Sequence, residues 1–238
     1  MSESVLQIKN IALVTGGSSG IGKAIVERLL NENFKVINAD LLPGNSIADS
    51  RYYFKQTDIT KGGQVQELFN FMNNKIGLPA ILICNAGKGI HEKLSEGDPE
   101  KWFNVINTNL MGTLRILRSF LPGLKEKSRA HIVIISSFTS KKPYVYGGIY
   151  SASKAALDMI AETLRLELND TTKVTLISPG IVDTEFFSNL ESGELDIGLI
   201  GLGALKPEEV ADAVLYAISS GSDTTINQII LSPNKQKM

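Results

Sequence analysis

Short apolar runs alternate along the chain with longer stretches in which apolar residues recur at helical spacing. The runs have the length of strands and cover residues 11–14, 34–39, 52–57, 80–84, 131–136, 174–178 and 226–231. Between them lie amphipathic stretches at 20–30, 64–75, 98–120, 150–169 and 207–218. The pattern predicts strands alternating with covering helices in one domain that spans residues 1–238.

Composition and charge narrow the choice of partners. The chain carries a net charge of -1, one cysteine and two histidines among 238 residues. It has no basic cluster to attract nucleic acid, no run of eighteen apolar residues to cross a membrane and no cysteine and histidine spacing of a zinc site. The first ten residues also lack an export signal. We therefore expect a small-molecule ligand, no metal and a cytoplasmic location, with Cys84 as an inert packed thiol.

A glycine-rich segment follows the first apolar run directly. Residues 15–22 read TGGSSGIG, which predicts a strand, a tight turn and the start of a helix. Glycines at 16, 20 and 22 let the backbone turn, approach a ligand and bring the helix close to the strand, while free amides at the helix start favour a pyrophosphate. The segment predicts a dinucleotide site; an ordinary strand-to-helix turn is the alternative.

An acidic residue closes the second run. Asp40 lies eighteen residues beyond Gly22, near where dinucleotide-binding folds place an acid on the adenosine ribose. Its carboxylate can accept both ribose hydroxyls and repels a 2'-phosphate, and neither Leu41 nor Leu42 offers a cation. NAD is therefore favoured over NADP. The alternative is that Asp40 merely opens the turn at Pro43.

The connection after Asp40 is short. Only eleven residues lie between Asp40 and Tyr52, whereas a helical crossover between parallel strands generally takes a dozen or more. We expect a trimmed crossover there. Asp58 and Ile59 then follow the third strand, where an acid can accept a hydrogen bond from an adenine amino group.

Tyr150 and Lys154 lie four residues apart at the start of a predicted helix, so that both can act on one atom. Tyrosine has an unperturbed pKa of about 10, and a nearby positive charge favours its phenolate. The pair predicts a general acid or base. Such a spacing also arises by chance in a chain with six tyrosines, so the interpretation depends on the rest of the sequence.

Other polar residues stand at the ends of predicted strands. Asn85-Ala86-Gly87 follows the fourth run, at the edge where open parallel sheets bind ligands. Ser136 and Ser137 end the fifth run, and either hydroxyl can bind a substrate oxygen beside Tyr150. The two histidines are not placed for acid-base catalysis: His131 begins a strand and is expected at the surface, and His91 is at most a substrate contact.

The ordered set of motifs resembles the short-chain dehydrogenase/reductase family. It runs from Thr15-Gly-x-x-x-Gly-Ile-Gly22 through Asn85-Ala-Gly87, Asn109, Ser137 and Tyr150-x-x-x-Lys154 to Pro179-Gly180 and Thr184. The resemblance covers about residues 8–230 and implies an α/β fold, a single doubly wound Rossmann sheet of about seven parallel strands. It also implies a nicotinamide cofactor and hydride transfer between an alcohol and a carbonyl compound. The short segment after Asp40 departs from the family's pattern, so the resemblance does not determine the structure of the adenine pocket.

The resemblance also assigns roles to residues. Ser137, rather than Ser136, would bind the substrate oxygen with Tyr150, while Lys154 acidifies the phenol and Asn109 joins a water-mediated proton relay to Lys154. The backbone of Ile181 and Val182 and the Thr184 hydroxyl would hold the nicotinamide. The expected catalytic residues are Asn109, Ser137, Tyr150 and Lys154. The expected cofactor-binding residues are Thr15, Gly16, Ser18, Ser19, Gly20, Ile21, Gly22, Asp40, Asp58, Ile59, Asn85, Ala86, Gly87, Tyr150, Lys154, Pro179, Gly180, Ile181, Val182 and Thr184.

Residues 184–206 are predicted to form a substrate lid, because they are apolar and rich in glycine and loops of this length are usually functional or disordered. Glu185, Phe186 and Phe187 would contribute to the pocket. The long helices around Asn109 and Tyr150 pair subunits in the resembled family, which implies a homotetramer or homodimer. Residues 235–238 are expected to be a solvated tail.

Two other functions compete with the oxidoreductase. A dinucleotide sensor without catalysis needs the glycine-rich loop but not the complete set of Asn109, Ser137, Tyr150 and Lys154. A sugar-nucleotide epimerase or dehydratase that retains NAD keeps Tyr and Lys but usually has a longer C-terminal substrate domain, and only 54 residues follow Thr184. The sequence therefore favours the oxidoreductase and leaves its substrate open.

Overall fold

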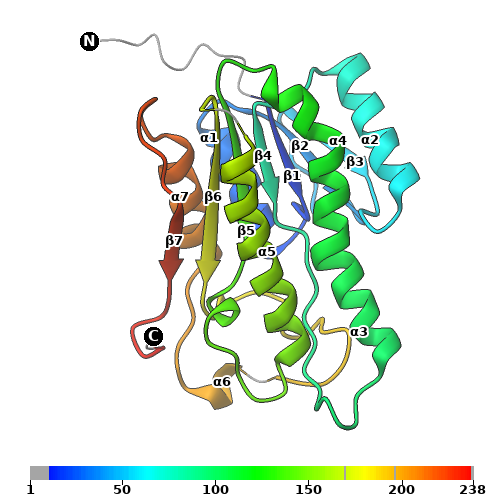
Figure 1. The fold of residues 1–238 in the computed structure, drawn as a ribbon, viewed down its shortest axis with the longest axis vertical. Coiled ribbons are helices and arrows are strands. Elements are labelled where there is room, and N and C mark those ends of the chain that lie inside the picture. The colour runs from blue at the N-terminus through cyan, green and yellow to red at the C-terminus, as the bar shows by residue number, and fades with distance from the viewer. Residues whose placement is uncertain (1–10, 169, 196, 237–238) are drawn as a thin grey trace.

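A seven-stranded, all-parallel sheet forms the centre of the molecule. The computed structural model describes residues 11–168, 170–195 and 197–236, and Figure 1 shows their arrangement. The strand order is β3-β2-β1-β4-β5-β6-β7, which confirms the expected doubly wound α/β fold. The strands are β1 (Ile11–Thr15), β2 (Lys35–Asp40), β3 (Tyr52–Gln56), β4 (Ile81–Cys84), β5 (Ala130–Ile135), β6 (Thr172–Pro179) and β7 (Gln228–Leu231).

Helices cover both faces of the sheet because its inner strands are apolar on both sides. Successive strand residues point to opposite faces, so Leu13 packs in one core cluster while Ala12 and Val14 pack in the other. The first cluster includes α2 (Gly62–Lys75), α4 (Thr113–Lys125) and α5 (Gly148–Glu167). The second includes α1 (Gly20–Asn31) and α7 (Pro207–Ile218). Figure 1 shows α4 and α5 in front of the sheet and α1 behind it.

The crossover between β2 and β3 contains no helix. Residues 41–51, all of them described, form only turns and irregular backbone, which confirms the trimmed connection. The register nevertheless pairs Asp40 with Gln56 at the ends of the two strands. The short connection therefore still aligns β3 with β2, so that both strands end at the same carboxyl edge of the sheet, where α/β folds bind their ligands.

A π-helical stretch interrupts the helix that the sequence predicts at 98–120. Asp98 caps α3 (Pro99–Ile106) by accepting a hydrogen bond from Glu100 N at 3.0 Å. Backbone of π-helical form then covers Asn107–Gly112 and continues into α4. Such stretches insert an extra residue into a turn and are frequent at functional sites. The stretch contains Asn109.

Two expectations about exposure are wrong. His131 is only 3 % exposed, because β5 is an inner strand of the sheet and is covered on both faces. Its Nε2 lies 2.7 Å from the Thr175 hydroxyl of the neighbouring strand β6. Gln236 is half-buried and contacts Ile181 instead of being solvated. Residues 237 and 238 lie outside the described part of the chain.

Candidate active site

The glycine-rich loop lies against the end of β4. The Asn85 side-chain amide donates to the carbonyls of Thr15 and Gly16 at 3.0 and 2.9 Å. A Cβ on Gly22 would lie 1.9 Å from the Gly16 carbonyl oxygen, so only glycine allows α1 to approach the loop this closely. The Thr15 hydroxyl accepts hydrogen bonds from the backbone amides of Asn85 and Ala86. The loop is thus held from below, and Ser19, Gly20 and Ile21, around the start of α1, line the cavity.

Asp40 binds the backbone on two sides. Its carboxylate accepts from Ser18 N at 2.9 Å and from Leu41 N at 2.6 Å. Next to it, the buried side chain of Asn38 accepts from Gly17 N at 3.0 Å and donates to the Ser18 hydroxyl at 2.9 Å. Sequence reasoning missed Asn38. An amide in an otherwise apolar strand was the available signal, because a buried amide must find partners.

Asp58 and Ile59 lie at the carboxyl end of β3, as predicted. Asp58 accepts hydrogen bonds from the backbone and hydroxyl of Thr60 at 2.9 and 2.6 Å, and Ile59 packs beside Gly112 of the π-helical stretch. Both line the cavity together with Asp40. The adenine end of the predicted cofactor site is therefore assembled in spite of the short crossover.

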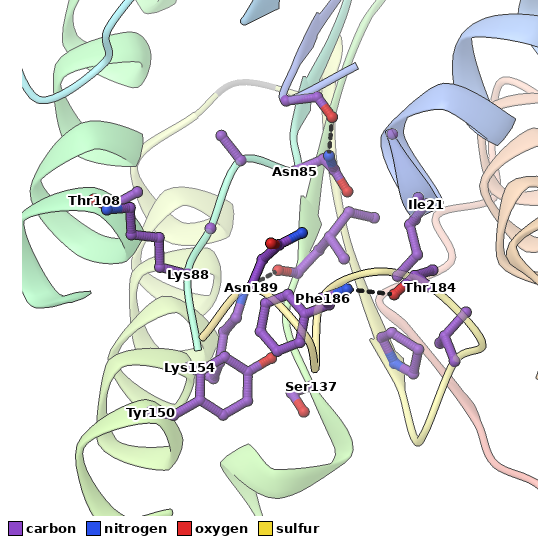
Figure 2. Close-up of a pocket in the computed structure, with 18 of the residues that line it drawn as sticks. Ile21, Asn85, Lys88, Thr108, Ser137, Tyr150, Lys154, Thr184, Phe186 and Asn189 are labelled. Carbon is purple, nitrogen blue, oxygen red and sulfur yellow. Dashed lines mark hydrogen bonds between the residues drawn. The ribbon is translucent and has the colours of Figure 1, made fainter. Parts of the chain in front are cut away.

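Tyr150 and Ser137 meet at the opposite end of the cavity. Tyr150 lies in the first turn of α5, and Ser137 lies two residues beyond the end of β5. The Ser137 hydroxyl accepts hydrogen bonds from the backbone and the hydroxyl of Thr139 at 3.2 and 3.0 Å. Figure 2 shows Ser137, Tyr150 and Lys154 gathered on one side of the pocket. The two residues whose hydroxyls were expected to share a substrate oxygen therefore line the same part of the cavity.

Phe186 covers the Tyr150 ring, with the two centroids 5.6 Å apart. Burial raises the pKa of Tyr150 above its ordinary value, and the hydrogen bond from Ser137 opposes this rise. Lys154 Nζ lies 5.8 Å from the centre of the Tyr150 ring. The expected acidification of the phenol by Lys154 is therefore not found in this state, because exclusion of water favours the neutral form.

Lys154 is 4 % exposed and donates to the Ile135 carbonyl at 2.8 Å. Burial lowers the pKa of Lys154 to about 8, and the negative charge of Asp158 opposes this effect. Asp158 also accepts hydrogen bonds from Ser136 and, at 2.7 Å, from Ser140. It thus holds both ends of the segment that carries Ser137. Sequence reasoning missed this carboxylate, although it lies one helical turn after Lys154.

Asn109 is fully buried behind the cavity wall. Its amide accepts from Lys88 N at 2.7 Å and donates to Lys88 O and the Ser153 hydroxyl, both at 2.9 Å. A Cβ on Gly87 would lie 3.2 Å from Asn109 Oδ1 and 3.5 Å from Lys154 Nζ. The absence of a side chain at Gly87 therefore leaves a gap between the two residues that the predicted proton relay connects.

Pro179–Thr184 continues from β6 along the cavity. Val182 forms a parallel bridge with Leu205, and Thr184 lies against Gly20, with its Cγ2 3.3 Å from where a glycine Cβ would stand. The segment expected to hold the nicotinamide thus reaches the glycine-rich loop. Beyond it, the described part of residues 185–206 contains one short helix, α6 (Ile197–Ile200), and lies at the carboxyl edge of the sheet (Figure 1).

Polar contacts tie this segment to the loop after β4. Lys88 Nζ lies 2.7 Å from Glu191 Oε2, and Asn104 donates to the same carboxylate at 2.9 Å. The hydrogen bond from Lys88 holds the pKa of Glu191 below its ordinary value. Asn189 and Phe186 of the same segment line the cavity around Tyr150 and Lys154 (Figure 2). Lys88 and Glu191 were also missed, because their sequence separation of 103 residues gives no local signal.

One cavity of about 1000 Å³ unites these residues. It is lined by every predicted site residue except Thr15, Ser18 and Asn109, which support it from behind. His91 is not among the lining residues; its ring contacts the carbonyls of Glu194 and Val145. Burial raises the pKa of Cys84 to about 12, which agrees with an inert thiol. The described residues contain neither a cluster able to hold a metal nor a helix able to cross a membrane.

Known proteins are similar in sequence and structure to nearly the whole chain. A relative in Staphylococcus saprophyticus subsp. saprophyticus, an uncharacterised oxidoreductase, is 35% identical over 94% of this chain and 97% of its own. Serine dehydrogenase from Escherichia coli has a TM-score of 0.84, with 28% identity over 96% of this chain and 100% of that one. A closed serine dehydrogenase complexed with NADP+ has a TM-score of 0.86, with 29% identity over 96% of each chain.

The family itself is recognised over most of the chain. The model of the short chain dehydrogenase family matches residues 10–195, which include the glycine-rich loop, Asn109, Ser137, Tyr150, Lys154 and the segment after β6. The match agrees with the strand order and with the similarity to relatives over nearly their full length. This chain therefore belongs to the short-chain dehydrogenase family of oxidoreductases.

Proposed function

We propose that this oxidoreductase transfers a hydride between NAD(H) and a small alcohol or carbonyl substrate, with Tyr150 as the general acid in reduction and the general base in oxidation. The observation that carries the proposal is that Ser137, Tyr150 and Lys154 line the same side of one cavity (Figure 2). Two hydroxyls that face the same cavity can bind one substrate oxygen together, and a positioned phenol can give it a proton or take one from it.

The residues of the cavity fit a nicotinamide dinucleotide. The amides of the glycine-rich loop at the start of α1 suit the pyrophosphate, Asp40 suits the adenosine ribose, and Val182 with Thr184 suits the carboxamide. The close approach of Gly22 to Gly16 supports this assignment, since a Cβ there would stand 1.9 Å from the Gly16 carbonyl oxygen and push α1 away from the loop. Such a cofactor supplies the hydride, and the protein supplies orientation and charge.

Tyr150, Lys154 and Asn109 would handle the proton. Tyr150 keeps its proton while it is buried, which suits donation to a substrate oxygen. The positive charge of Lys154 stabilises the phenolate left behind, and its ammonium can bind the nicotinamide ribose. Protons would return to the Tyr150 oxygen from the side of Asn109, through the gap beside Gly87 and then through Lys154. No covalent intermediate with the protein is needed.

NAD is the preferred cofactor in this proposal. Asp40 brings a negative charge to the ribose end, and Ser18 and Leu41, which it binds, carry no compensating cation. A similar structure is complexed with NADP+, so the preference needs a direct test. We expect turnover with NAD to exceed turnover with NADP at least about tenfold, because a 2'-phosphate would approach a carboxylate.

Asp40→Asn should narrow this preference by about tenfold, since it removes the charge and keeps one acceptor for the backbone amides. Rates with the two cofactors, measured on one substrate, give the answer. A wild-type preference for NADP would overturn this part of the proposal. Ser46→Asn, in the exposed part of the same crossover, controls for general effects of the substitution.

Residues 184–206 form the substrate lid in this proposal. Phe186 lies over Tyr150 and packs against Phe187 with ring centroids 5.5 Å apart, so a substrate must displace or stack on this aromatic pair. Exposed Met159 and Leu166 on α5 support the predicted homotetramer or homodimer, because apolar side chains on a helix face suit a subunit contact. Assembly and cytoplasmic location stay predictions.

Tyr150→Phe tests the mechanism. We expect the rate of NADH formation or loss to fall about 10²- to 10⁴-fold, the usual contribution of a general acid or base, while NADH binding is retained. A panel of alcohols and ketones identifies the substrate first, and it includes serine because two similar structures are serine dehydrogenases. Tyr216→Phe, on a tyrosine that is 69% exposed, is the matched control. Near-normal rates in the Tyr150 variant would overturn the proposal.

A further inference from the structure

The turn after β7 folds back onto the segment expected to hold the nicotinamide. Gln236 N donates to Pro233 O at 2.8 Å and closes the turn. The Gln236 side-chain oxygen then accepts a hydrogen bond from Ile181 N at 3.0 Å. Gly180 N also donates to Leu231 O at 2.7 Å. Gln236 lines the same cavity as Tyr150, although its position in the sequence suggests only a solvated tail.

The contact depends on a glycine. A Cβ on Gly180 would stand 2.1 Å from Gln236 Oε1 and 3.2 Å from Pro233 Cδ. Because real Cβ atoms do not approach other atoms at 2.1 Å, any other residue at 180 would push the turn away. Gly180 therefore provides the space that the Gln236 amide occupies.

The hydrogen bond between Gln236 and Ile181 adds to two backbone hydrogen bonds that hold residues 181–183 against Leu205. Ile181 O accepts from Leu205 N, and Leu205 O accepts from Asp183 N, both at 2.8 Å. With Gln236, both backbone groups of Ile181 are therefore occupied. In such a parallel bridge the backbone groups of the intervening residue, Val182, point away from Leu205. No described residue accepts a hydrogen bond from Val182 N, which leaves this donor for a ligand.

We infer that Gln236 is a positioning residue for the nicotinamide end of the site: by binding Ile181 N it fixes the orientation in which the Val182 amide meets the cofactor's carboxamide. This inference rests on the proposed function, since it assigns a ligand to Val182. Gln236 acts through Ile181. Its loss should weaken the binding of the nicotinamide half and leave the adenine half, at Asp40, unchanged.

The test compares two variants in the full chain. Gln236→Met removes the acceptor and keeps the length of the side chain, whereas Gln236→Glu keeps an oxygen that can accept from Ile181 N. NADH binding is titrated by its fluorescence, and ADP-ribose, which lacks the nicotinamide, is titrated by calorimetry. We expect Gln236→Met to bind NADH about 3- to 10-fold more weakly than the wild type, which is the effect of one lost hydrogen bond. Its affinity for ADP-ribose should equal that of the wild type. Gln236→Glu should stay within about twofold of the wild type for both ligands.

The outcomes separate the inference from the proposed function. Unchanged NADH binding in Gln236→Met, or an equal loss for NADH and ADP-ribose, would overturn the inference while the proposed function stands. Failure of Gln236→Glu to rescue NADH binding would also count against it, provided that its thermal unfolding matches the wild type. If the wild type binds neither NADH nor NAD, the proposed function itself fails and the inference falls with it.

Discussion

Asn109 and Glu191 bind the same residue, Lys88, from two sides of the cavity, and they do so differently. Asn109 is fully buried and binds the Lys88 backbone through both atoms of its amide. Glu191 binds the Lys88 ammonium, whose side chain is 42% exposed. The Glu191 side chain is 17% exposed, so this ion pair is only partly open to solvent. Breaking a buried polar contact costs about 1–3 kcal/mol, whereas an ion pair at the surface contributes about 0–1 kcal/mol.

The difference divides the cavity into a fixed side and an adjustable side. The fixed side comprises Asn109, Ser137, Tyr150 and Lys154, whose contacts are largely buried and include many backbone partners. The adjustable side is the segment around Glu191. Backbone hydrogen bonds join Glu191 to Gly89 at 2.9 Å and Ser192 to His91 at 3.0 Å, and its other contacts are made by partly exposed side chains. Catalysis needs fixed geometry, and substrate entry needs movement, so each side has the kind of contact that suits its proposed task.

The largest effect should be a loss of stability in acid, when His131 is protonated. His131 is buried in β5, the strand that leads to Ser137. Burial lowers the pKa of His131 from 6.5 to about 4. The pKa of His131 is lower in the folded than in the unfolded chain. The contribution of neutral His131 to stability is therefore complete above pH 6.5 and is lost as the pH falls to about 4. The free energy of unfolding should decrease by about 3 kcal/mol over this window.

Urea unfolding at about pH 7, 5.5 and 4.5 measures this loss. His131→Gln should reduce the pH dependence, because a neutral amide can still donate to the Thr175 hydroxyl, which itself donates to Ile226 O at 2.6 Å. The chain has only one other histidine, so His91→Gln is the matched control and should keep the acid loss. An unchanged pH dependence in His131→Gln would contradict the burial argument.

The next effect concerns the gap between Asn109 and Lys154. Gly87→Ala places a methyl group 3.2 Å from Asn109 Oδ1 and 3.5 Å from Lys154 Nζ. We expect turnover to fall about 10- to 100-fold, because a displacement of about 1 Å at a catalytic group can have this effect. NADH titration should show retained binding. Gly63→Ala, where nothing lies within 4 Å of the added Cβ, provides the control. Wild-type turnover in Gly87→Ala would argue against the relay.

The smallest effect should appear on the adjustable side. Glu191→Gln removes the charge that pairs with Lys88, and we expect KM for the substrate to rise about two- to fivefold with kcat unchanged. Raising the salt concentration to about 0.5 M should have the same effect on the wild type and little on the variant. Glu96→Gln breaks a more exposed pair, with Lys93, and should change neither constant. A large fall in kcat would place Glu191 on the fixed side instead.

The strands and most helices were predictable because they depend on local pattern, and most of the predicted site residues line the cavity for the same reason. Alternation of apolar runs and helical spacing places Asp40 and Ser137 at strand ends, and all strand ends of a parallel sheet meet at one edge. His131 was misjudged, because periodicity within a run of isoleucine and valine does not reveal burial on both faces.

Partners distant in the sequence could not be predicted. Gln236 meets Ile181 from 55 residues away, and Asp158 meets Ser136 from 22. The polarity of these residues is ordinary for a helix surface or a chain segment after the last strand. Only the folded arrangement shows that their side chains hold the segments that the motifs identify.

The π-helical turn at Asn107–Gly112 bears on how this chain tolerates changes in length. Because such a turn holds one residue more than an α-helical turn, deletion of Thr108 would let the segment close into an ordinary helix with α3 and α4 still packed as they are. The same deletion inside α4 would instead rotate its two parts by about 100° against each other. We therefore expect the chain to fold without the extra residue, and the deletion to disturb the hydrogen bonds between Asn109 and Lys88.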